Sequence, residues 1–444
     1  MKVKGRILSL LQFLLDVFSV FISYRIWIFL RVIFNKPYSF ENSLALNKVY
    51  PYLLGTFIIL GFIYNLFDVS KDDNHEIFLD IILSTFFLFL LSFSFSFFVR
   101  AFSVPRTVLI FSFPIQVVLL LLSHSLIKNL HSYLYPLPNV LIITEKKDAQ
   151  IFDKELETYW GNSKVKGISV EVERDSLANV LEILKKEHFD FVVIDGSMKD
   201  TAKTIFLREL AKLDKKVYIM PSIQELLVFN SGIRFVNDTA LFELTPIKFD
   251  PLQLVLKRII DLFISVVALV VLSPLLVIFS VLILIDSGRP IFYLQDRAGL
   301  NGKIFKLIKF RTMIKNAEKD TGPILSSESD PRITKIGRFL RKTGFDEIPQ
   351  FFNVLKGDMS VVGPRPERPE LMKEILKKVP EFDLRLKVKP GITGFAQLYG
   401  RYDTDFEKKL KMDLLYIKQR NIILTDIYII FNTLKLFLSP HKRK

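Results

Sequence analysis

The sequence predicts a membrane protein with helical and α/β parts: four N-terminal transmembrane helices, a Rossmann-like α/β domain, and a re-entrant membrane helix hairpin with an α-rich cytoplasmic domain. Half of the 444 residues are hydrophobic, and phenylalanine alone occurs 42 times. Apolar runs of about 20 residues, the length that a helix needs to cross a bilayer, fill the first third of the chain. Segments typical of strands and of helices then alternate, as they do around a parallel sheet.

The four apolar runs define a predicted transmembrane domain over residues 1–134. They cover about residues 7–34, 49–67, 77–99 and 107–127. Asp16 interrupts the first run, and we expect it to face another helix because a carboxylate in lipid is costly. No small-residue cleavage site follows the basic N-terminus, so the pattern favours an uncleaved membrane helix over a signal peptide. Four spans and the charged domains that follow favour a cytoplasmic location for both ends of this domain.

A Rossmann-like domain is predicted over residues 135–247. Strands are expected at residues 140–144, 191–195 and 217–220, and helices at residues 177–186 and 201–213. The first strand runs into Glu145-Lys146-Lys147-Asp148, where a nucleotide-binding domain needs a glycine-rich loop. We therefore expect this domain to serve regulation or assembly.

Residues 248–444 form the third predicted domain, which starts with an uncharged apolar run over residues 262–285. Ser273-Pro274 lies at the middle of this run, and an internal proline kinks or breaks a helix. The run is preceded by Lys257, Arg258 and Asp261, and further basic residues follow it. Basic residues on both sides favour a re-entrant helix over residues 257–286 with both ends cytoplasmic. A proline-kinked helix that spans the membrane is the alternative.

The charged residues limit the chemistry that the chain can perform. The formal net charge is +15, cysteine is absent, and the only histidine after Lys257 is His441. A thiol nucleophile is therefore excluded and an imidazole base is disfavoured, which leaves carboxylate, metal and Arg/Lys chemistry. The basic residues lie beside apolar segments rather than in stretches typical of nucleic-acid binding. We expect membrane lipid and phosphate-bearing substrates as partners, and no nucleic acid.

Two adjacent carboxylates, Asp346 and Glu347, stand at a predicted helix start. With Asp346 as the N-cap, Pro349 falls in the first turn and Gly357 ends the helix. The predicted core face consists of Ile348, Phe351, Phe352 and Leu355. A helix N-terminus attracts anions, and a hard cation would offset the repulsion between the two acids and a phosphate. We expect Mg²⁺, with Mn²⁺ as a substitute, bound by Asp346 and Glu347; the alternative is that the acids only cap the helix.

Two further segments supply cations. Residues 304–313 alternate apolar and basic residues as a half-buried strand does, which places Lys306 and Arg311 near one rim. Gly363-Pro364-Arg365-Pro366 forms a rigid turn that can hold a guanidinium toward the acid pair.

Five motifs in one order give residues 257–438 a family resemblance. They are Lys257-Arg258 and Asp261 before Ser273-Pro274; Gly302 to Phe305 with Lys309-Phe310-Arg311-Thr312-Met313; Arg332 to Thr343 running into Asp346-Glu347-Ile348-Pro349-Gln350; Gly363-Pro364-Arg365-Pro366; and Lys389-Pro390-Gly391-Ile392-Thr393-Gly394. This part resembles the catalytic unit of the bacterial monotopic polyprenyl-phosphate hexose-1-phosphate transferases, which initiate polysaccharide assembly. The four N-terminal spans and the glycine-poor α/β domain resemble the long branch of that family.

The resemblance implies an undecaprenyl-phosphate sugar phosphotransferase of surface polysaccharide synthesis. It would transfer a hexose 1-phosphate from a UDP-sugar to undecaprenyl phosphate, with release of UMP, through a covalent aspartyl-phosphosugar intermediate. Asp346 would be the nucleophile, Glu347 would hold the metal or tune its neighbour, and phosphate oxygens would bind to Arg311, Arg341 and Arg365. We expect a homodimer in the bacterial cytoplasmic (inner) membrane, with the catalytic domain facing the cytoplasm.

The sequence departs from the family pattern at Gly344-Phe345, where many relatives carry Ser-Leu; the change removes a capping hydroxyl. The alternative function is a catalytically inactive membrane scaffold of polysaccharide assembly. A polytopic phosphosugar transferase would need more spans than this chain supplies. No motif identifies the hexose.

Overall fold

The computed structural model describes residues 2–34, 39–69, 71, 73–100, 104–134, 139–144, 164–169, 182–183, 186, 189–196, 198–212, 216–244, 249–315, 317, 330–400 and 404–438. The chain divides into two compact units, Met1–Pro221 and Ser222–Lys444. The Glu145-Lys146-Lys147-Asp148 segment, most of the predicted helix over residues 177–186, and His441 lie outside the described residues.

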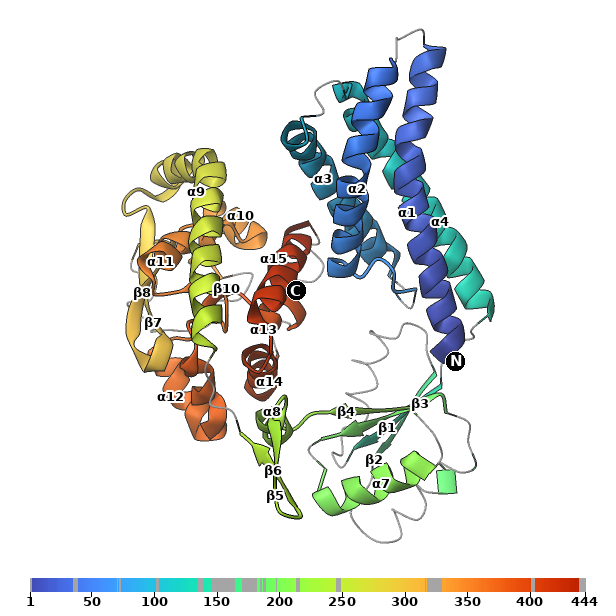
Figure 1. The fold of residues 1–444 in the computed structure, drawn as a ribbon. Coiled ribbons are helices and arrows are strands. Elements are labelled where there is room, and N and C mark those ends of the chain that lie inside the picture. Colours follow the sequence, from blue (N-terminus) through green and yellow to red (C-terminus); the bar gives the residue numbers. More distant parts are fainter. Residues whose placement is uncertain are drawn as a thin grey trace. The chain divides into compact units, whose positions relative to one another are not determined.

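Four long helices open the first unit and overlap the four apolar runs of the sequence (Figure 1). They are α1 (Lys2–Ile33), α2 (Phe40–Ile63), α3 (Asn74–Phe98) and α4 (Arg106–Leu134). Together with α9 of the second unit, they are the five helices, within the part of the chain that the structure describes, that are long and apolar enough to cross a membrane.

The carboxylate of Asp16 is buried between α1 and α4. Its Oδ1 accepts hydrogen bonds from Gln12 Nε2 and Ser123 Oγ at 2.6 and 2.7 Å, and its Oδ2 lies 3.0 Å from His124 Nε2. The expectation that Asp16 faces another helix is confirmed. These polar contacts replace exposure to lipid, which a carboxylate tolerates poorly.

The rest of the first unit contains a four-stranded sheet in the order β2-β1-β3-β4, and its strands are parallel. The strands are β1 (Asn139–Thr144), β2 (Lys164–Ser169), β3 (Phe191–Asp195) and β4 (Lys216–Met220). Helix α7 (Asp200–Lys212) packs Phe206 and Leu210 against Val192 of β3 in a fully buried cluster. The structure thus contains β1, β3, β4 and α7 where the apolar runs predicted them.

The second unit is a mixed α/β assembly. It begins with α8 (Ile223–Val228), the hairpin β5 (Gly232–Val236) and β6 (Thr239–Glu243), and α9 (Pro251–Ser287). A second antiparallel hairpin follows, β7 (Phe292–Ala298) and β8 (Ile304–Phe310), joined through the short 3-10 helix η1 (Leu300–Gly302). The remaining elements are α10 (Lys335–Thr343), η2 (Phe345–Glu347), α11 (Gln350–Lys356), β9 (Ser360–Val362), α12 (Pro369–Lys378), η3 (Pro380–Lys387), β10 (Gly391–Thr393), α13 (Phe395–Tyr399), α14 (Phe406–Ile417) and α15 (Ile422–Leu438).

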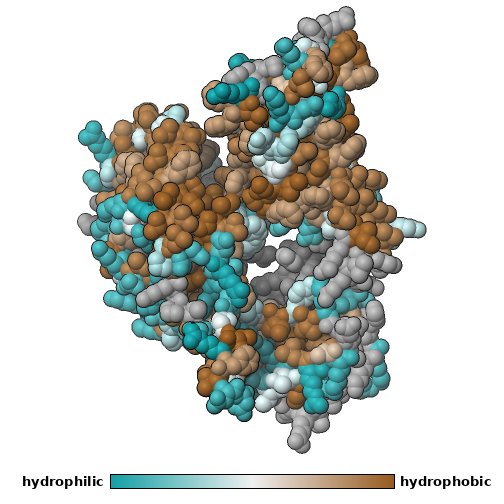
Figure 2. Space-filling model, viewed as in Figure 1, coloured by the Kyte–Doolittle hydropathy of each residue, from teal (hydrophilic) through white to brown (hydrophobic). Residues whose placement is uncertain are grey.

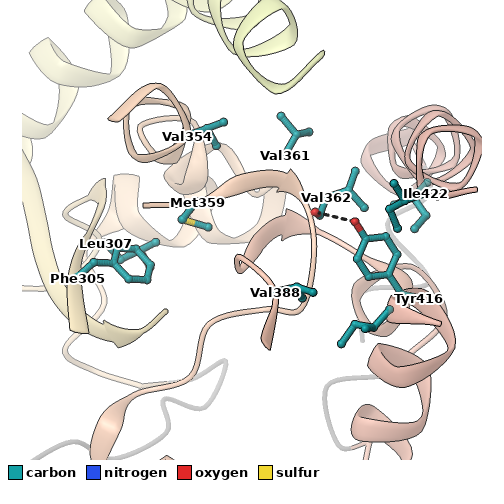
Figure 3. Packing of buried hydrophobic residues seen from close by; sticks show 11 residues of the cluster. Phe305, Leu307, Val354, Met359, Val361, Val362, Val388, Tyr416 and Ile422 are labelled. Atoms are coloured by element: carbon teal, nitrogen blue, oxygen red, sulfur yellow. Dashed lines mark hydrogen bonds between the residues drawn. The ribbon is translucent and has the colours of Figure 1, made fainter. Parts of the chain in front are cut away.

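A central core cluster joins β8, α11, β9, α14 and α15 of the second unit (Figure 3). Val354 and Met359 are fully buried in it, and Phe305 and Leu307 enter it from β8. Tyr416 of α14 adds a polar contact inside this core, because its hydroxyl donates to the Val362 carbonyl at 3.1 Å. Short strand β9 is therefore held from several sides, and it leads directly into the Gly363-Pro364-Arg365-Pro366 turn.

Helix α9 is apolar, long and bent. Figure 1 shows it as two helical arms that meet at an angle. Pro274 lies inside the helix, and an internal proline is the usual cause of such a bend. Ser273 Oγ donates to the Val270 carbonyl at 2.8 Å, a local bond that accompanies the break. Only 11% of the most apolar part of α9 is buried inside the protein. Apolar residues gather on the surface of the second unit where α9 lies, and hydrophilic residues where α12 lies (Figure 2).

Helix α8 packs within the second unit. Leu226 is buried in a cluster with Met372, Phe382, Leu410 and Leu414, and the cluster also includes Ile375. The boundary between the compact units therefore falls at Pro221 and Ser222, whereas the sequence-based division assigned residues 222–247 to the α/β domain. The three-domain division itself stays a prediction.

Leu226→Ala tests whether α8 is part of the second unit's core. Because Leu226 is 2% exposed, its truncation should destabilise this unit by about 2–4 kcal/mol. The readout is the temperature at which the second unit of the full-length protein becomes susceptible to proteolysis. Val228→Ala, on the same helix at a 36% exposed position, is the control and should change that temperature little. An unchanged temperature for Leu226→Ala would contradict the packing described.

Candidate active site

The acid pair lies on the 3-10 turn η2 between α10 and α11. Gly344 ends α10 in the left-handed conformation, with φ of +76°, and Glu347 N donates to the Gly344 carbonyl at 3.2 Å. The prediction that Asp346 is the N-cap of a helix is therefore wrong, since α11 starts later, with Pro349 as its N-cap residue. Glycine suits this sharp reversal because it adopts positive φ without steric cost.

Helix α11 ends at Gly357, as predicted, with φ of +95°. Its buried side chains are Gln350, Asn353 and Val354, whereas Phe352 is 42% exposed. The predicted core face was thus partly wrong. Asn353 explains much of the difference: its side-chain amide bonds both the Ile308 N–H and the Lys306 carbonyl of β8, at 2.9 and 2.7 Å, so a polar side chain occupies the buried face.

Glu347 forms a bidentate pair with Arg365. The two oxygens of Glu347 accept from Arg365 Nη2 and Nη1 at 2.5 and 3.2 Å. Burial raises the pKa of Glu347, but the charge and hydrogen bonds of Arg365 and the charge of Lys309 outweigh burial, so this pKa lies below its usual value. Glu347 therefore stays ionised, with one lone pair of each oxygen engaged.

Asp346 has the opposite electrostatics. Burial and the neighbouring Glu347 charge raise the pKa of Asp346 to about 6. Among the described residues, none donates a hydrogen bond to its carboxylate. Asp346 is thus a carboxylate that ionises near neutral pH and keeps its lone pairs available, as a nucleophile or metal ligand must.

Lys309 of β8 lies near enough to the acid pair for its charge to act on both carboxylates. Burial and the charge of Arg297 lower the pKa of Lys309 to about 8, against the opposing influence of Asp346 and Glu347. Its ammonium lies 5.5 Å from the centre of the Tyr293 ring and has no hydrogen-bond acceptor among the described residues. A cation placed beside two carboxylates without a direct partner is available to a phosphate.

The turn that carries Arg365 is held through its own carbonyl groups. The Val362 carbonyl accepts from Lys257 Nζ and Tyr416 Oη at 3.0 and 3.1 Å, and the Pro364 carbonyl accepts from Gly391 N at 2.9 Å. The next carbonyls along the chain accept from Arg385 Nη2 at 2.8 Å, Arg297 Nη1 at 2.9 Å and Ala298 N at 3.0 Å. A backbone fixed in this way presents the Arg365 guanidinium in one place, which preorganises the site.

The structure brings two of the three predicted phosphate-binding arginines to the acid pair. Arg365 bonds Glu347, and the charge of Arg341 acts on Asp346 while its Nε donates to Thr312 Oγ1 at 2.8 Å. Arg311 lies at the end of α9, where its Nη2 donates to the Ser287 and Gly288 carbonyls at 2.6 and 2.7 Å. The assignment of Arg311 to phosphate binding stays a prediction.

The residues at the start of α9 anchor this helix to the site. Lys257 Nζ lies 2.5 Å from Asp426 Oδ2 of α15 and also holds Val362. Arg258 donates to the Val354 and Leu355 carbonyls at the end of α11, at 2.7 and 2.9 Å. Asp261 Oδ1 accepts from Val361 N and Ser360 Oγ of β9 at 2.9 and 3.0 Å. The three charged residues of this motif, Lys257, Arg258 and Asp261, thus form tertiary contacts with β9, α11 and α15.

A family model described as bacterial sugar transferase matches residues 252–440, which include every residue of this site. A Bacillus subtilis protein, proposed to be an undecaprenyl-phosphate N-acetylgalactosaminyl 1-phosphate transferase, is 45% identical over 152 residues. The match covers 34% of this chain and 80% of that protein. The chain belongs to the bacterial sugar transferase family.

Longer members of the family extend the likeness beyond the catalytic part. The UDP-N-acetylgalactosamine-undecaprenyl-phosphate N-acetylgalactosaminephosphotransferase of Aeromonas hydrophila is 36% identical over 256 residues, 56% of this chain and 59% of that protein. The UDP-glucose:undecaprenyl-phosphate glucose-1-phosphate transferase of Klebsiella pneumoniae is 34% identical over 297 residues, 63% of each chain. The matched part of this chain thus spans about three fifths of these relatives.

The acid pair of this sugar transferase fits a magnesium ion shared with a substrate. Within the described residues, no three His, Cys, Asp or Glu side chains come together as a metal site. Mg²⁺ is commonly bound by one or two carboxylates together with water and substrate phosphates. Asp346 has free lone pairs, and Glu347 keeps a second lone pair on each oxygen beside Arg365. These two residues would therefore hold the ion.

Sequence reasoning missed Lys309, Arg297 and Arg385. The alternation along residues 304–313 pointed instead to Lys306, whose ammonium is exposed and pairs with Asp296 Oδ1 at 2.8 Å. Strand β8 ends at Phe310, so the expected alternation does not extend to Arg311. Lys309 belongs to the motif Lys309-Phe310-Arg311-Thr312-Met313, but no local feature of the sequence distinguishes it from Lys306.

Proposed function

We propose that this protein transfers a sugar 1-phosphate from a UDP-sugar to undecaprenyl phosphate, giving an undecaprenyl-diphosphate-sugar and UMP, as the first step of surface polysaccharide synthesis. The observation that carries the proposal is the position of the unbonded Asp346 carboxylate beside the Glu347–Arg365 pair and Lys309. Relatives named for this reaction support it.

In the first step, a carboxylate oxygen of Asp346 attacks the sugar-bearing phosphorus of the UDP-sugar. The bond from that phosphorus to the bridging oxygen breaks, the oxygen leaves with UMP, and Asp346 carries the sugar 1-phosphate as an acyl phosphate. Lys309, Arg341 and Arg365 supply positive charge around the phosphate oxygens.

In the second step, an oxygen of the lipid phosphate attacks the same phosphorus and expels Asp346 as a carboxylate. Donor and lipid thus use one phosphate site in turn. A bound Mg²⁺, held by Asp346 and Glu347, would supply charge neutralisation for the phosphates.

The membrane position follows from the same proposal. The lipid phosphate lies at headgroup level, so the acid pair must reach the membrane surface. We place α1 to α4 across the bacterial cytoplasmic membrane, and both ends of the bent α9 and the second unit on its cytoplasmic side. The polar contacts of Lys257, Arg258 and Asp261 with β9, α11 and α15 support this arrangement, because they tie the start of α9 to the catalytic part.

The homodimer also belongs to the proposal. Ile233, Phe235 and Phe242 of the β5–β6 hairpin are 60%, 74% and 65% exposed. Monomeric proteins seldom expose contiguous apolar patches, and a second copy of the chain would cover this one.

Asp346→Asn tests the nucleophile. The amide cannot form an acyl phosphate, so turnover measured as UMP release should fall by about 10³-fold or more. The wild-type protein incubated with donor alone should gain the mass of a sugar phosphate, and the variant should not. Asp296→Asn, a surface carboxylate of the same unit, is the control and should retain turnover. Near-normal turnover by Asp346→Asn would remove this residue from the nucleophile's role.

The pH profile of the rate of UMP release should have an acid limb and an alkaline limb. Asp346 must be ionised, and its pKa is about 6, so the rate should fall as pH drops below that value. Lys309 must be protonated, and its pKa is about 8, so the rate should fall as pH rises above that value. Lys309→Arg keeps its charge at higher pH and should remove the alkaline limb. A wild-type profile without these limbs contradicts the assigned roles.

Metal removal tests the role of Mg²⁺. With donor and lipid saturating, excess EDTA should abolish UMP release, and added Mg²⁺ or Mn²⁺ should restore it, because two carboxylates beside a pyrophosphate need a cation. Full activity in EDTA would exclude the metal from the reaction.

Single cysteines test the arrangement of α9, since the chain has none of its own. Cysteines at Leu252 and Arg289, exposed positions at the two ends of α9, should both react with an impermeant thiol reagent in inverted vesicles and not in intact cells. A cysteine at Phe40, the first residue of α2, is the control of opposite sidedness and should react in intact cells. Labelling of positions 252 and 289 from opposite sides would show that α9 spans the membrane.

A further inference from the structure

Arg385 contacts the backbone of the turn that carries Arg365. It belongs to η3, and its side chain is 4% exposed. Its Nη2 donates to the Arg365 carbonyl at 2.8 Å, while the Arg365 side chain points to Glu347. Among the charges that chiefly shift the pKa values of Asp346 and Glu347, Arg385 does not appear. Its connection to the site thus runs through the Arg365 backbone.

The other side of the Arg385 guanidinium is also engaged. Its Nε lies 2.9 Å from Asp413 Oδ2 of α14, and its Nη1 lies 3.7 Å from Glu367 Oε1. Its guanidinium carbon lies 4.5 Å from the centre of the Phe382 ring. Asp413 is 2% exposed, and its burial raises its pKa to about 6, against the effect of Arg385. The guanidinium thus donates a hydrogen bond to a backbone carbonyl, pairs by charge with an acid and lies against a ring.

A buried ion pair of this kind needs a reason beyond stability. Replacing such a pair by apolar side chains is often neutral or stabilising, because two charges must be desolvated. The planar guanidinium, however, fixes several donors in one geometry, which an ammonium cannot do. The feature that the Arg385–Asp413 pair secures is the position of one carbonyl, that of Arg365.

We propose that Arg385, oriented by Asp413, is a positioning residue that holds the backbone of Arg365 so that its guanidinium meets Glu347. Without it, the turn keeps its neighbouring contacts through Arg297 and Gly391 but loses the bond at Arg365 itself. The inference rests on the proposed transferase activity. The inference predicts that Arg385 affects the rate of UMP release only when residue 365 is arginine.

A double-mutant cycle in the full-length protein tests this dependence. Arg385→Lys keeps a positive charge beside Asp413 but lacks the fork, and it should lower kcat/KM for UMP release by about 10- to 100-fold. In an Arg365→Lys background, the same change should cost less than about 3-fold, because residues acting through one another are not additive.

Ile375→Val is the matched structural control. It removes packing from the buried cluster that contains Phe382, at a residue of α12 that is not one of the partners orienting Arg385. It should lower the unfolding temperature and leave kcat/KM for UMP release within about 3-fold of the wild-type value. Asp413→Asn is a second variant in case Arg385→Lys does not fold; it should show the same non-additivity with Arg365→Lys at a smaller amplitude. Effects of Arg385→Lys and Arg365→Lys that multiply in full would overturn the inference. Absence of UMP release by the wild-type protein with every UDP-sugar would instead overturn the proposed function.

Discussion

The bidentate pairing of Glu347 with Arg365 is the interaction on which the site depends. Two adjacent carboxylates in a half-buried position repel each other, and burial disfavours the ionised form of both. Arg365 relieves this repulsion unequally: it keeps the pKa of Glu347 low, whereas the pKa of Asp346 rises to about 6. Glu347 is thus a carboxylate whose charge is neutralised by Arg365, whereas the Asp346 carboxylate accepts no hydrogen bond from the described residues. The contacts that position the Arg365 guanidinium therefore also determine this difference between the pKa values of Glu347 and Asp346.

The turn around Arg365 shows how the chain meets that requirement. Gly363 and Gly391 approach so closely that a Cβ on Gly391 would lie 2.0 Å from Gly363 N, so only glycine fits at these two positions. Side chains from β7, η3, α9 and α14 then bond the successive carbonyls of the turn. The contacts come from elements far apart in the sequence, so the turn is rigid only once the whole second unit has folded.

This distribution of contacts explains what the sequence could predict. Hydrophobic periodicity depends on local burial, and it predicted β1, β3, β4, α7 and the apolar α9; the family motifs named Asp346, Glu347 and Arg365. The conformation of the acid pair was mispredicted because the left-handed Gly344 ends α10 directly before it. The partner of Arg311 is Ser287, 24 residues away, and that of Arg385 is Asp413, on another helix. Tertiary packing chooses such partners, and no local pattern encodes them.

Helix α9 contacts both halves of the site from its two arms. The first arm bonds β9 through Asp261, which accepts from Val361 N, four residues before Arg365. The second arm meets the residue before Asp346, because the rings of Phe279 and Phe345 lie 5.5 Å apart. The aromatic side chain of Phe345 thus joins α9 to the acid pair.

The break at Ser273-Pro274 lies between these two points of attachment. On a straight helix, Asp261 and Phe279 would be about 27 Å apart along the axis. In the structure, Asp261 contacts β9, which precedes Arg365, and Phe279 contacts η2, which ends at Glu347. Glu347 and Arg365 are hydrogen-bonded to each other. The bend at Pro274 therefore allows one helix, apolar over most of its surface, to support the acid pair with one arm and the arginine turn with the other.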